Sequence, residues 1–326
     1  MKNLYLLFVV IMLCITACTK QPEKAAQPQA PIQASLRLAW VYDMAEVGVL
    51  VAKERGFYAK EGIDLKIEPG GFGLDPFKLV AADSNDFGVG GAGNLLLARE
   101  KGVPVVSVGT EFQNTPVGFI VREESGISNF KNFRNKKVGV QTGSDTDVLY
   151  RALLTQNGMK SSDVKEIPIQ FDMTPFVAKN IDVLPGYVTN QPITLAGKGV
   201  KTRVITAKSE GLNYYGNIFF VTEKTLKERP ELVKRFMRAT KAGWEHALTN
   251  KADAIAALKV YTKDFGDNDL DKIYDAVMPF IKPDEQAVPL LGMTRQRWES
   301  TQNVLTSSGL MKKTLDISSA YSSISY

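Results

Sequence analysis

Aromatic, amide and acidic side chains gather near the predicted ends of strands and starts of helices, where α/β proteins bind their ligands. The candidates are Trp40, Tyr42, Asp43, Asn94, Tyr187, Asn190, Tyr214 and Tyr215. Aromatic faces with hydroxyl and amide groups beside them suit a planar, apolar ligand that has a few polar edges. These residue types therefore predict a cleft that binds a small molecule.

Some of these polar groups have structural interpretations that compete with ligand binding. Gly143-Ser144 precedes a predicted helix, so its backbone N–H groups could hold an anion, or the pair could form a tight turn capped by the serine. Asp43 and Glu46 have the spacing of a capping box, a role that we favour for Glu46 over ligand contact. Asn190 could cap the helix that follows it. The sequence leaves both interpretations of Gly143-Ser144 open.

Catalytic chemistry finds little support in the sequence. His246 is the single histidine, and the two cysteines, Cys14 and Cys18, both precede the predicted folded body. The sequence contains no His/Glu metal spacing, no Gly-x-Ser-x-Gly elbow and no phosphate-binding loop. We therefore predict no catalytic residue, no metal and no cofactor, and we do not expect an enzyme.

One motif, Gly88-x-Gly90-x-x-Gly93, matches the dinucleotide-binding fingerprint, and Glu111 stands near the expected acidic position. The fingerprint should follow the first strongly apolar strand, whereas this motif lies in a short third strand. We expect instead that the glycines let a strand end and a helix start approach a ligand closely.

The N-terminal residues indicate export. Residues 1–17 form a predicted signal peptide, in which Lys2 precedes an apolar run too short to span a membrane. The run ends in Ile-Thr-Ala before Cys18, which resembles the lipobox of bacterial lipoproteins and predicts acylation of Cys18 and insertion into the lipid bilayer. Residues 18–35, rich in Pro, Gln, Ala and Lys, are then a flexible tether. The alternative is an ordinary signal peptide with an incidental cysteine.

Strand–helix–strand units recur along the body, beginning with residues 36–67, and predict an α/β fold with parallel sheets. We expect a first lobe over 36–114, a second lobe over 115–217, and a return to the first lobe with C-terminal helices over 218–326. Such an order requires two chain crossings, which form a natural hinge. The C-terminal residues from Thr314 onward are left unassigned.

The charge of the chain argues against nucleic-acid binding. The formal net charge of +5 falls to +4 when Lys2 leaves with the signal peptide. Basic residues are scattered among acidic ones and form no stripe. We expect a monomer with a small-molecule ligand and no nucleic-acid partner.

Several ordered blocks of sequence resemble the solute-binding proteins of ABC importers, in the group that unites nitrate, sulfonate and taurine binders with thiamine-pyrimidine proteins. The blocks are GFYAKEGIDLKI, DFGVGGAGNLLLAREKGVPVVSV, KKVGVQTGS, DVLPGYVTNQP and YYGNIFFVTEKTLKERPELVKRFMRATKAGWEHAL. The resemblance implies the two-lobe periplasmic-binding-protein type II fold, with a mainly parallel sheet and flanking helices in each lobe and two hinge crossings. It also implies that the protein works outside the cytoplasm and delivers its ligand to an ABC permease in the membrane.

The resemblance leaves the ligand open. The pyrimidine branch has a Trp-x-Pro-Asn-like opening with a histidine three residues later, where this chain has Trp40-Val41-Tyr42-Asp43 and Glu46. It also has a Tyr-x-Thr-Asn-Glu-Pro-like segment, in which Gln191 here replaces the acid. Pyrimidine synthases of the group use a cysteine-rich motif that this chain lacks. We expect a thiamine-precursor pyrimidine or a flavin; an alkanesulfonate, taurine or nitrate binder, a synthase-like enzyme and a sensory module are the alternatives.

For a heteroaromatic ligand, the resemblance assigns roles to the candidate residues. Trp40 would stack on the ring, with Tyr187 and either Tyr214 or Tyr215 on the opposite lobe. Asn94 and Asn190 would bind polar edges, and Gly143 and Ser144 would supply backbone donors.

Overall fold

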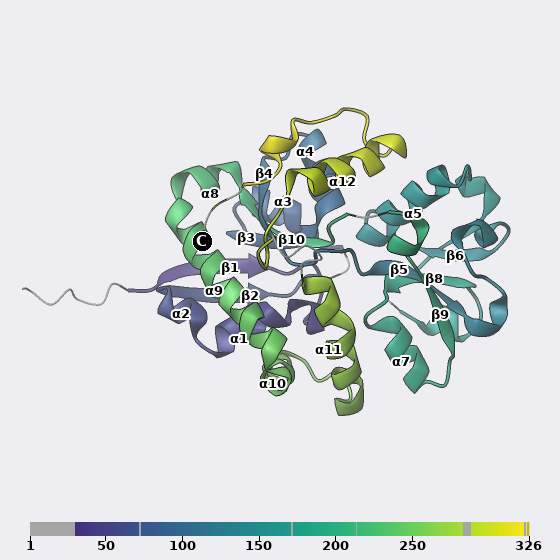
Figure 1. Ribbon diagram of the computed structural model, residues 1–326, viewed down its shortest axis with the longest axis horizontal. Coiled ribbons are helices and arrows are strands. Elements are labelled where there is room, and N and C mark those ends of the chain that lie inside the picture. The colour runs from purple at the N-terminus through teal and green to yellow at the C-terminus, as the bar shows by residue number, and fades with distance from the viewer. Residues whose placement is uncertain are drawn as a thin grey trace, which may run out of the picture. The chain divides into compact units, whose positions relative to one another are not determined.

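The strand–helix units fold into two five-stranded sheets, described here from a computed structural model (Figure 1). The structure describes residues 30–71, 73–170, 172–212, 214–282, 288–322, 324 and 326. The first sheet has the order β2 (Ile63–Glu68), β1 (Ile32–Arg37), β3 (Phe87–Gly91), β10 (Asn217–Thr222) and β4 (Val105–Thr110). The second has the order β7 (Lys165–Pro168), β6 (Lys137–Val140), β8 (Val183–Tyr187), β5 (Val117–Arg122) and β9 (Thr202–Thr206).

Each sheet is mixed, with four strands running in one direction and one strand opposed. In the first sheet β10 is antiparallel to both of its neighbours, β3 and β4. In the second sheet β5 is antiparallel to β8 and β9. The remaining pairings, β1 with β2 and β3 and β6 with β7 and β8, are parallel. The prediction of an α/β fold with mainly parallel sheets is confirmed, and the opposed strand in each sheet is the one that follows a chain crossing.

The helices cover both sheets. Those that follow strands of the first sheet are α1 (Val47–Glu54), α2 (Phe57–Lys60), α3 (Pro76–Ala81), α4 (Ala92–Glu100) and α8 (Glu223–Glu228). The C-terminal helices are α9 (Pro230–Thr249), α10 (Lys251–Tyr261), α11 (Asp267–Ile281) and α12 (Arg295–Ser307), and the second lobe has α5 (Asp145–Gln156), α6 (Thr174–Val177) and α7 (Gln191–Gly197). Short 3₁₀ segments are η1 (Met44–Glu46), η2 (Glu123–Ser125), η3 (Phe130–Phe133), η4 (Ser161–Asp163), η5 (Lys208–Glu210) and η6 (Ile317–Ser319). Within the described ranges, no helix has the length and apolar character that crossing a membrane requires.

Local signals in the sequence set several element boundaries. Asp75 accepts hydrogen bonds from the first backbone N–H groups of α3, with Pro76 at the first helical position. Gly56, with φ of +70°, separates α1 from α2. One face of α9 is apolar and buried, and it packs on α1 where Gly243 approaches Gly48; a Cβ on Gly243 would lie 2.1 Å from the Gly48 carbonyl oxygen.

The N-terminal boundary of the fold lies earlier than predicted. β1 begins at Ile32, so residues 32–35 of the predicted tether belong to the first sheet. Ile32 pairs with Ile63 of β2, and alternate residues Ala34 and Leu36 are buried. The Pro- and Gln-rich composition hid this alternation. The signal peptide, Cys18 and the rest of the tether up to residue 29 lie outside the described residues, so those assignments stay predictions.

The two chain crossings lie side by side. The first joins β4 to β5, and the second leads from β9 back to β10, which begins at Asn217, one residue before the predicted return. Thr115 N donates to the Tyr214 carbonyl (3.2 Å), and Gly216 N donates to the Phe112 carbonyl (3.1 Å). A rotation of one lobe against the other would therefore be concentrated in two paired segments.

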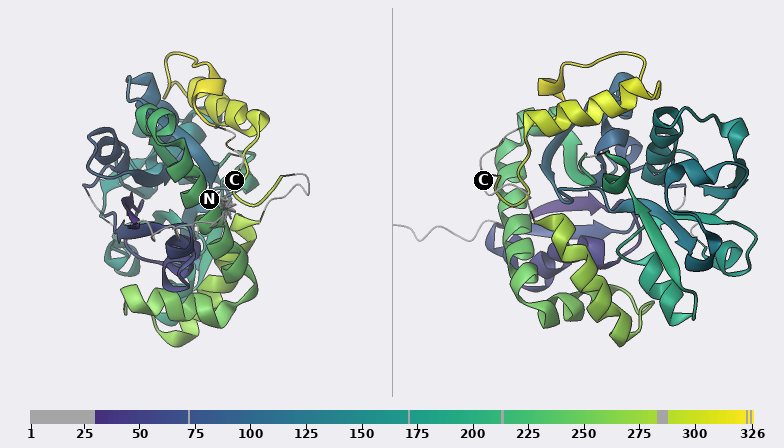
Figure 2. Two further views of the ribbon diagram at one scale, coloured as in Figure 1. Left: turned by 90° about the vertical axis from the view of Figure 1, so that its left-hand side faces the viewer. Right: turned by 45° about the vertical axis from the view of Figure 1, so that its right-hand side comes forward.

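Helices of the first lobe also contact the second lobe beyond the crossings. In the right-hand view of Figure 2, α12, in yellow, lies beside both α4 and α5, and α11 lies beside α7. The unassigned C-terminal residues extend the first sheet, since Ser107 of β4 hydrogen-bonds to Ala320 and Ser322 (3.0 and 2.8 Å). The elements around the crossings therefore bring the two lobes into contact.

Candidate functional site

The candidate site lies at the edge where the parallel strands of the first sheet end. The loop after β1 carries Asp43 and Glu46, and Glu111 follows β4 directly. Because β10 runs in the opposite direction, its first residue, Asn217, lies at the same edge and pairs with Gly91 at the end of β3. Carboxyl ends of strands are where open α/β sheets bind ligands.

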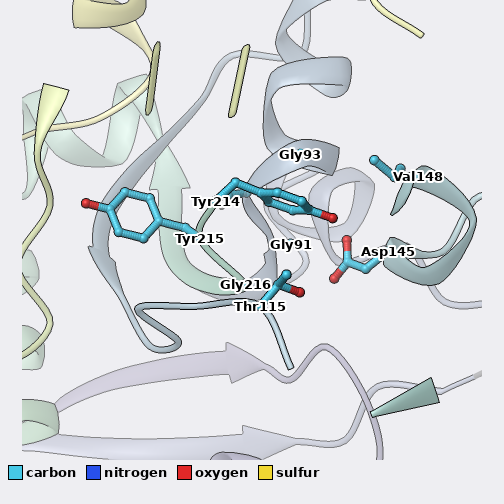
Figure 3. A pocket seen from close by; sticks show the side chains of 9 residues that line it. Gly91, Gly93, Thr115, Asp145, Val148, Tyr214, Tyr215 and Gly216 are labelled. Atoms are coloured by element: carbon cyan, nitrogen blue, oxygen red, sulfur yellow. The ribbon is translucent and has the colours of Figure 1, made fainter. Parts of the chain in front are cut away.

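A first contact between the lobes joins α4 to α5. Asn94 Nδ2 donates to Asp145 Oδ1 at 2.7 Å. The approach requires a glycine at position 91, because a Cβ there would lie 1.8 Å from Asp145 Oδ1. Tyr214 turns its hydroxyl toward Asp145, and the two residues line a cavity of about 10 Å³ (Figure 3). This volume is roughly that of one water molecule, so nothing larger fits here while the lobes are in contact.

A second contact between the lobes joins the end of β8 to the start of β10. The Tyr187 hydroxyl donates to Asn217 Oδ1 at 3.1 Å. The Tyr187 ring lies edge-on to Phe112, with ring centroids 6.1 Å apart. Glu111 N donates to the Asn217 carbonyl at 2.8 Å. Tyr187 thus covers the segment that holds Glu111.

Of the four carboxyls in this region, those of Glu46 and Glu111 are buried and those of Asp43 and Asp145 are half-buried. Glu46 is 1% exposed and Glu111 is 0% exposed. Burial, together with the charge of Asp43, raises the pKa of Glu46 to about 8, and burial with the charge of Glu46 raises the pKa of Glu111 well above its usual value. Burial also raises the pKa of Asp43 and of Asp145 to about 6. In the described part of the chain, no lysine or arginine is among the groups that shift these four pKa values.

The capping-box prediction for Glu46 is wrong. Asp43 Oδ1 does accept from Ala45 N (2.7 Å) and caps η1. The Glu46 side chain makes no cap hydrogen bond and instead interacts with Glu111 inside the first lobe. Tertiary packing, which brings the end of β4 beside this loop, overrides the local spacing signal.

Two of the three glycines of the motif, Gly88 and Gly90, pack against core side chains, whereas Gly93 lines the cavity at the lobe contact. A Cβ on Gly88 would lie 2.3 Å from the Phe220 ring, and one on Gly90 would lie 2.6 Å from the Phe77 ring. These glycines leave room for two stacked aromatic rings of the core, whose centroids are 4.4 Å apart. At the lobe contact itself, Gly91 faces Asp145 and Gly93 faces Val148, so a close approach of a ligand to Gly93 stays a prediction.

The helix start at Gly143-Ser144 is satisfied by its own chain. Asp147 Oδ2 accepts from Gly143 N (2.9 Å), and Ser144 Oγ accepts from Asp147 N (3.3 Å) and donates to the Gln141 carbonyl (2.7 Å). The first turn of α5 also carries two acids, Asp145 and Asp147. Of the two open interpretations, this geometry favours the capped turn over an anion site.

Three other predicted site residues, Tyr42, Trp40 and Asn190, make the following contacts away from the two lobe contacts described above. Tyr42 donates to the Ile67 carbonyl (3.0 Å) and packs on Tyr261, and both of these contacts lie within the first lobe. Trp40 is half-buried, and its carbonyl accepts from Gly70 N (2.8 Å). Asn190 precedes α7 without a side-chain cap, and its Oδ1 accepts from Thr194 (3.2 Å).

Tyr214 and Tyr215, adjacent in sequence, have different positions. Tyr215 points away from the cavity (Figure 3), accepts from Thr294 N at 2.8 Å and packs edge-on to Trp298 in the core. Tyr214 is therefore the one of the two that faces the second lobe.

Sequence reasoning missed Glu111, Asp145 and Asn217 as residues of this region. Glu111 was weighed only as part of the dinucleotide fingerprint, although its position directly after a buried strand was a usable signal. Asn217 had no such signal, because its place at the edge depends on β10 being antiparallel. Asp145 follows Gly143-Ser144 at the start of α5, and this local pattern gives no sign that it meets Asn94 of the other lobe.

The sheets, crossings and lobe contacts define the two-lobe fold of periplasmic binding proteins. The alkanesulfonate-binding protein SsuA from Xanthomonas axonopodis pv. citri, solved bound to MOPS, has this fold; its TM-score is 0.69 at 16% identity, over 89% of this chain and 98% of that chain. A family model described as NMT1/THI5 like matches residues 44–254, and the chain belongs to this family.

Two relatives show how varied the family is. The chain is 28% identical over 335 aligned residues to riboflavin-binding protein RibY of Chloroflexus aurantiacus, covering 96% of this chain and 94% of RibY. It is also 28% identical over 250 residues to 4-amino-5-hydroxymethyl-2-methylpyrimidine phosphate synthase of Legionella pneumophila, covering 76% of this chain and 79% of the synthase. The predicted family resemblance is confirmed.

Proposed function

We propose that this protein is the extracytoplasmic solute-binding subunit of an ABC importer, and that it captures a small heteroaromatic nutrient between its two lobes. The ligand class is a flavin or a thiamine-precursor pyrimidine. Acylated Cys18 would anchor the protein to the cell envelope, and a membrane permease would receive the ligand. The protein would act without catalysing a reaction.

The observation that carries this proposal is the composition of the lobe contact. Tyr187 and Tyr214 present aromatic rings there, and Asn94, Asn217 and buried carboxyls supply polar groups. Flat rings with few polar edges suit such a surface. The similarity to RibY along nearly the whole chain supports a ligand of this kind.

The sulfonate and nitrate alternative fits this surface poorly. An anion needs free backbone donors or a cation, whereas the N–H of Gly143 is bonded to Asp147 and Asp145 stands beside it. Structural likeness to SsuA at 16% identity supports the fold and carries no ligand assignment.

The enzyme alternative also lacks support from side-chain chemistry. The body after residue 18 contains no cysteine, and His246, the single histidine, lies on α9 with its Nε2 2.6 Å from Asp253 of α10. Where the structure describes the chain, no group of acids and histidine could hold a metal ion. These features favour binding over synthesis.

A ligand panel tests the proposal. Thermal unfolding of the purified protein would be measured with riboflavin, 4-amino-2-methylpyrimidine, taurine, an alkanesulfonate and nitrate. A ligand present at a hundred times its dissociation constant stabilises the folded state by about 2.7 kcal/mol. We expect stabilisation by a ring compound alone; stabilisation by sulfonate or nitrate alone would refute the ligand class.

A second test uses Trp40. Replacing Trp40 by alanine should abolish binding of the ring compound while the protein stays folded, and Trp40→Phe should keep measurable affinity because it keeps an aromatic face. Isothermal titration would measure both. An alanine variant that binds within about twofold of wild type would remove Trp40 from the site.

A further inference from the structure

Two glutamates at the lobe contact have oxygens without a partner. Glu46 Oε2 and both carboxyl oxygens of Glu111 are buried and form no hydrogen bond of normal geometry with the described residues, although the two carboxyls interact with each other and the Asn217 side chain interacts with Glu111. The two residues come from separate segments, η1 after β1 and the loop after β4. Buried polar groups in folded proteins are nearly always hydrogen-bonded, so this pair needs an explanation.

A purely structural role explains the pair poorly. Buried acceptors without donors destabilise the folded state, and two adjacent buried acids also repel each other when both are ionised. Apolar residues of similar size would pack here at lower cost. Tyr58 and Thr240 of the first lobe share a 2.7 Å hydrogen bond, whereas Arg99 Nε and the indole nitrogens of Trp244 and Trp298 are also buried without a partner among the described residues; the two glutamates are the acids in this group.

The position of the pair indicates what the missing partner is. Glu111 is adjacent to Phe112, whose ring contacts Tyr187 of the second lobe, and its backbone N–H bonds to Asn217, which Tyr187 also contacts. When the lobes separate, Tyr187 leaves this segment and the first-lobe edge that carries the pair is uncovered. A ligand held between the lobes would then lie against it.

We propose that Glu46 and Glu111 form the polar floor of the cleft and accept hydrogen bonds from N–H donors on the edge of a planar nitrogen heterocycle. This inference rests on the proposed function. An amino group on a pyrimidine and the imide N–H of a flavin share this chemistry. A carboxylate accepts such donors directly, and a protonated carboxyl both accepts an N–H and donates to a neighbouring ring nitrogen or carbonyl.

Matched ligands test the proposal. For a pyrimidine, 4-amino-2-methylpyrimidine would be compared with 4-methoxy-2-methylpyrimidine, which has no N–H. For a flavin, riboflavin would be compared with N3-methylriboflavin. We expect the wild-type protein to bind the N–H form of one ligand pair with a dissociation constant about tenfold lower, or lower still, than that of its partner without the N–H. The pair that binds shows whether the ligand is a pyrimidine or a flavin.

Matched variants separate a binding role from a structural one. Glu46→Met and Glu111→Met remove the acceptors at similar volume, Glu46→Gln and Glu111→Gln keep one acceptor each, and Glu124→Met alters an exposed glutamate as the control. We expect each Met variant at the floor to melt at or above the wild-type temperature and yet to lose the preference for the N–H form to within about threefold. The Gln variants should lie between, and the control should match wild type in both measurements.

The outcomes are distinct. A Met variant that melts as wild type and keeps the full preference overturns the floor assignment alone. If one Met variant fails to fold, the other and the two Gln variants decide. Wild-type protein that binds neither a pyrimidine nor a flavin overturns the proposed function and this inference with it, whereas wild-type binding without any preference overturns only the inference.

Discussion

Glu46 and Glu111 of the first lobe are buried without a cation, whereas Asp147 and Glu166 of the second lobe share Arg151. Arg151 donates to both oxygens of Glu166 (2.5 and 3.0 Å) and, through Nε, to Asp147 Oδ1 (3.0 Å). Burial alone would raise the pKa of Glu166, but hydrogen bonds from Arg151, Ser161 and Tyr150 and the charge of Arg151 together outweigh it, and the pKa lies below its usual value. The pKa values of Glu46 and Glu111 move in the opposite direction.

The difference separates a structural acid from one available to a ligand. Asp147 and Glu166 lie on α5 and β7, where a bidentate arginine completes their hydrogen bonding. Glu46 and Glu111 lie where the second lobe contacts the first, and the hydrogen bonding of their carboxyl oxygens is incomplete. Proteins tolerate such destabilising groups mainly at functional sites.

The largest expected effect is on the pH dependence of stability. In the folded protein the pKa of Glu46 is about 8 against an ordinary 4.5, and those of Asp43 and Asp145 are about 6 against 3.8. At these three carboxyls the folded state therefore binds more protons than the unfolded state between these values, so their contribution to stability is full below about pH 4 and is lost as the pH rises to about 8. Each carboxyl removes up to about 1.4 kcal/mol of unfolding free energy per pH unit within its window.

Urea unfolding at pH 5, 6.5 and 8 would measure this loss. Glu46→Met should flatten the decline of the unfolding free energy between pH 6.5 and 8, because it removes the carboxyl whose pKa is about 8. A wild-type stability that stays constant from pH 5 to pH 8 would show that these acids are not held in their neutral form.

Removing Arg151, the cation that Asp147 and Glu166 share, should have an intermediate effect on stability. We expect Arg151→Met to lower the unfolding free energy at pH 7 by about 1–2 kcal/mol, because Glu166 and Asp147 lose charged hydrogen bonds in a partly exposed setting. Arg295→Met, which breaks an exposed pair with Glu299 on α12, is the matched control and should leave stability unchanged within error. Equal effects of the two variants on the unfolding free energy would mean that Arg151 stabilises Asp147 and Glu166 no more than an exposed ion pair does.

The smallest expected effect concerns the lobe contact itself. Asn94→Ala removes the hydrogen bond to Asp145, which should cost about 0.5–1.5 kcal/mol and shift the unliganded protein toward separated lobes. Small-angle scattering would detect a larger radius of gyration. Asn157→Ala removes a 2.9 Å bond to the Leu153 carbonyl within one lobe and should not change the radius. A radius that is the same in both variants would mean that Asn94 does not hold the lobes together.

Local patterns in the sequence predicted the elements that position the site. Alternating apolar residues, the Asp75-Pro76 start of α3 and the apolar face of α9 each depend on neighbours within a few residues, so each could be recognised without tertiary information. The ordered blocks then identified the family. The strand ends at which Asp43, Tyr187 and Glu111 stand follow from the same local patterns.

Only the tertiary structure decided which of these residues meet. Asn94 and Asp145 are 51 positions apart, and Tyr187 and Asn217 are 30 apart. Tyr214 and Tyr215 are the same residue type at neighbouring positions, yet Tyr214 faces the lobe contact and Tyr215 packs on Trp298. Glu46 satisfies a local capping pattern and still turns to Glu111, because the end of β4 lies beside it. Periodicity and caps are local properties that the sequence by itself determined, whereas contacts between distant loops depend on strand order and direction, which only folding decides.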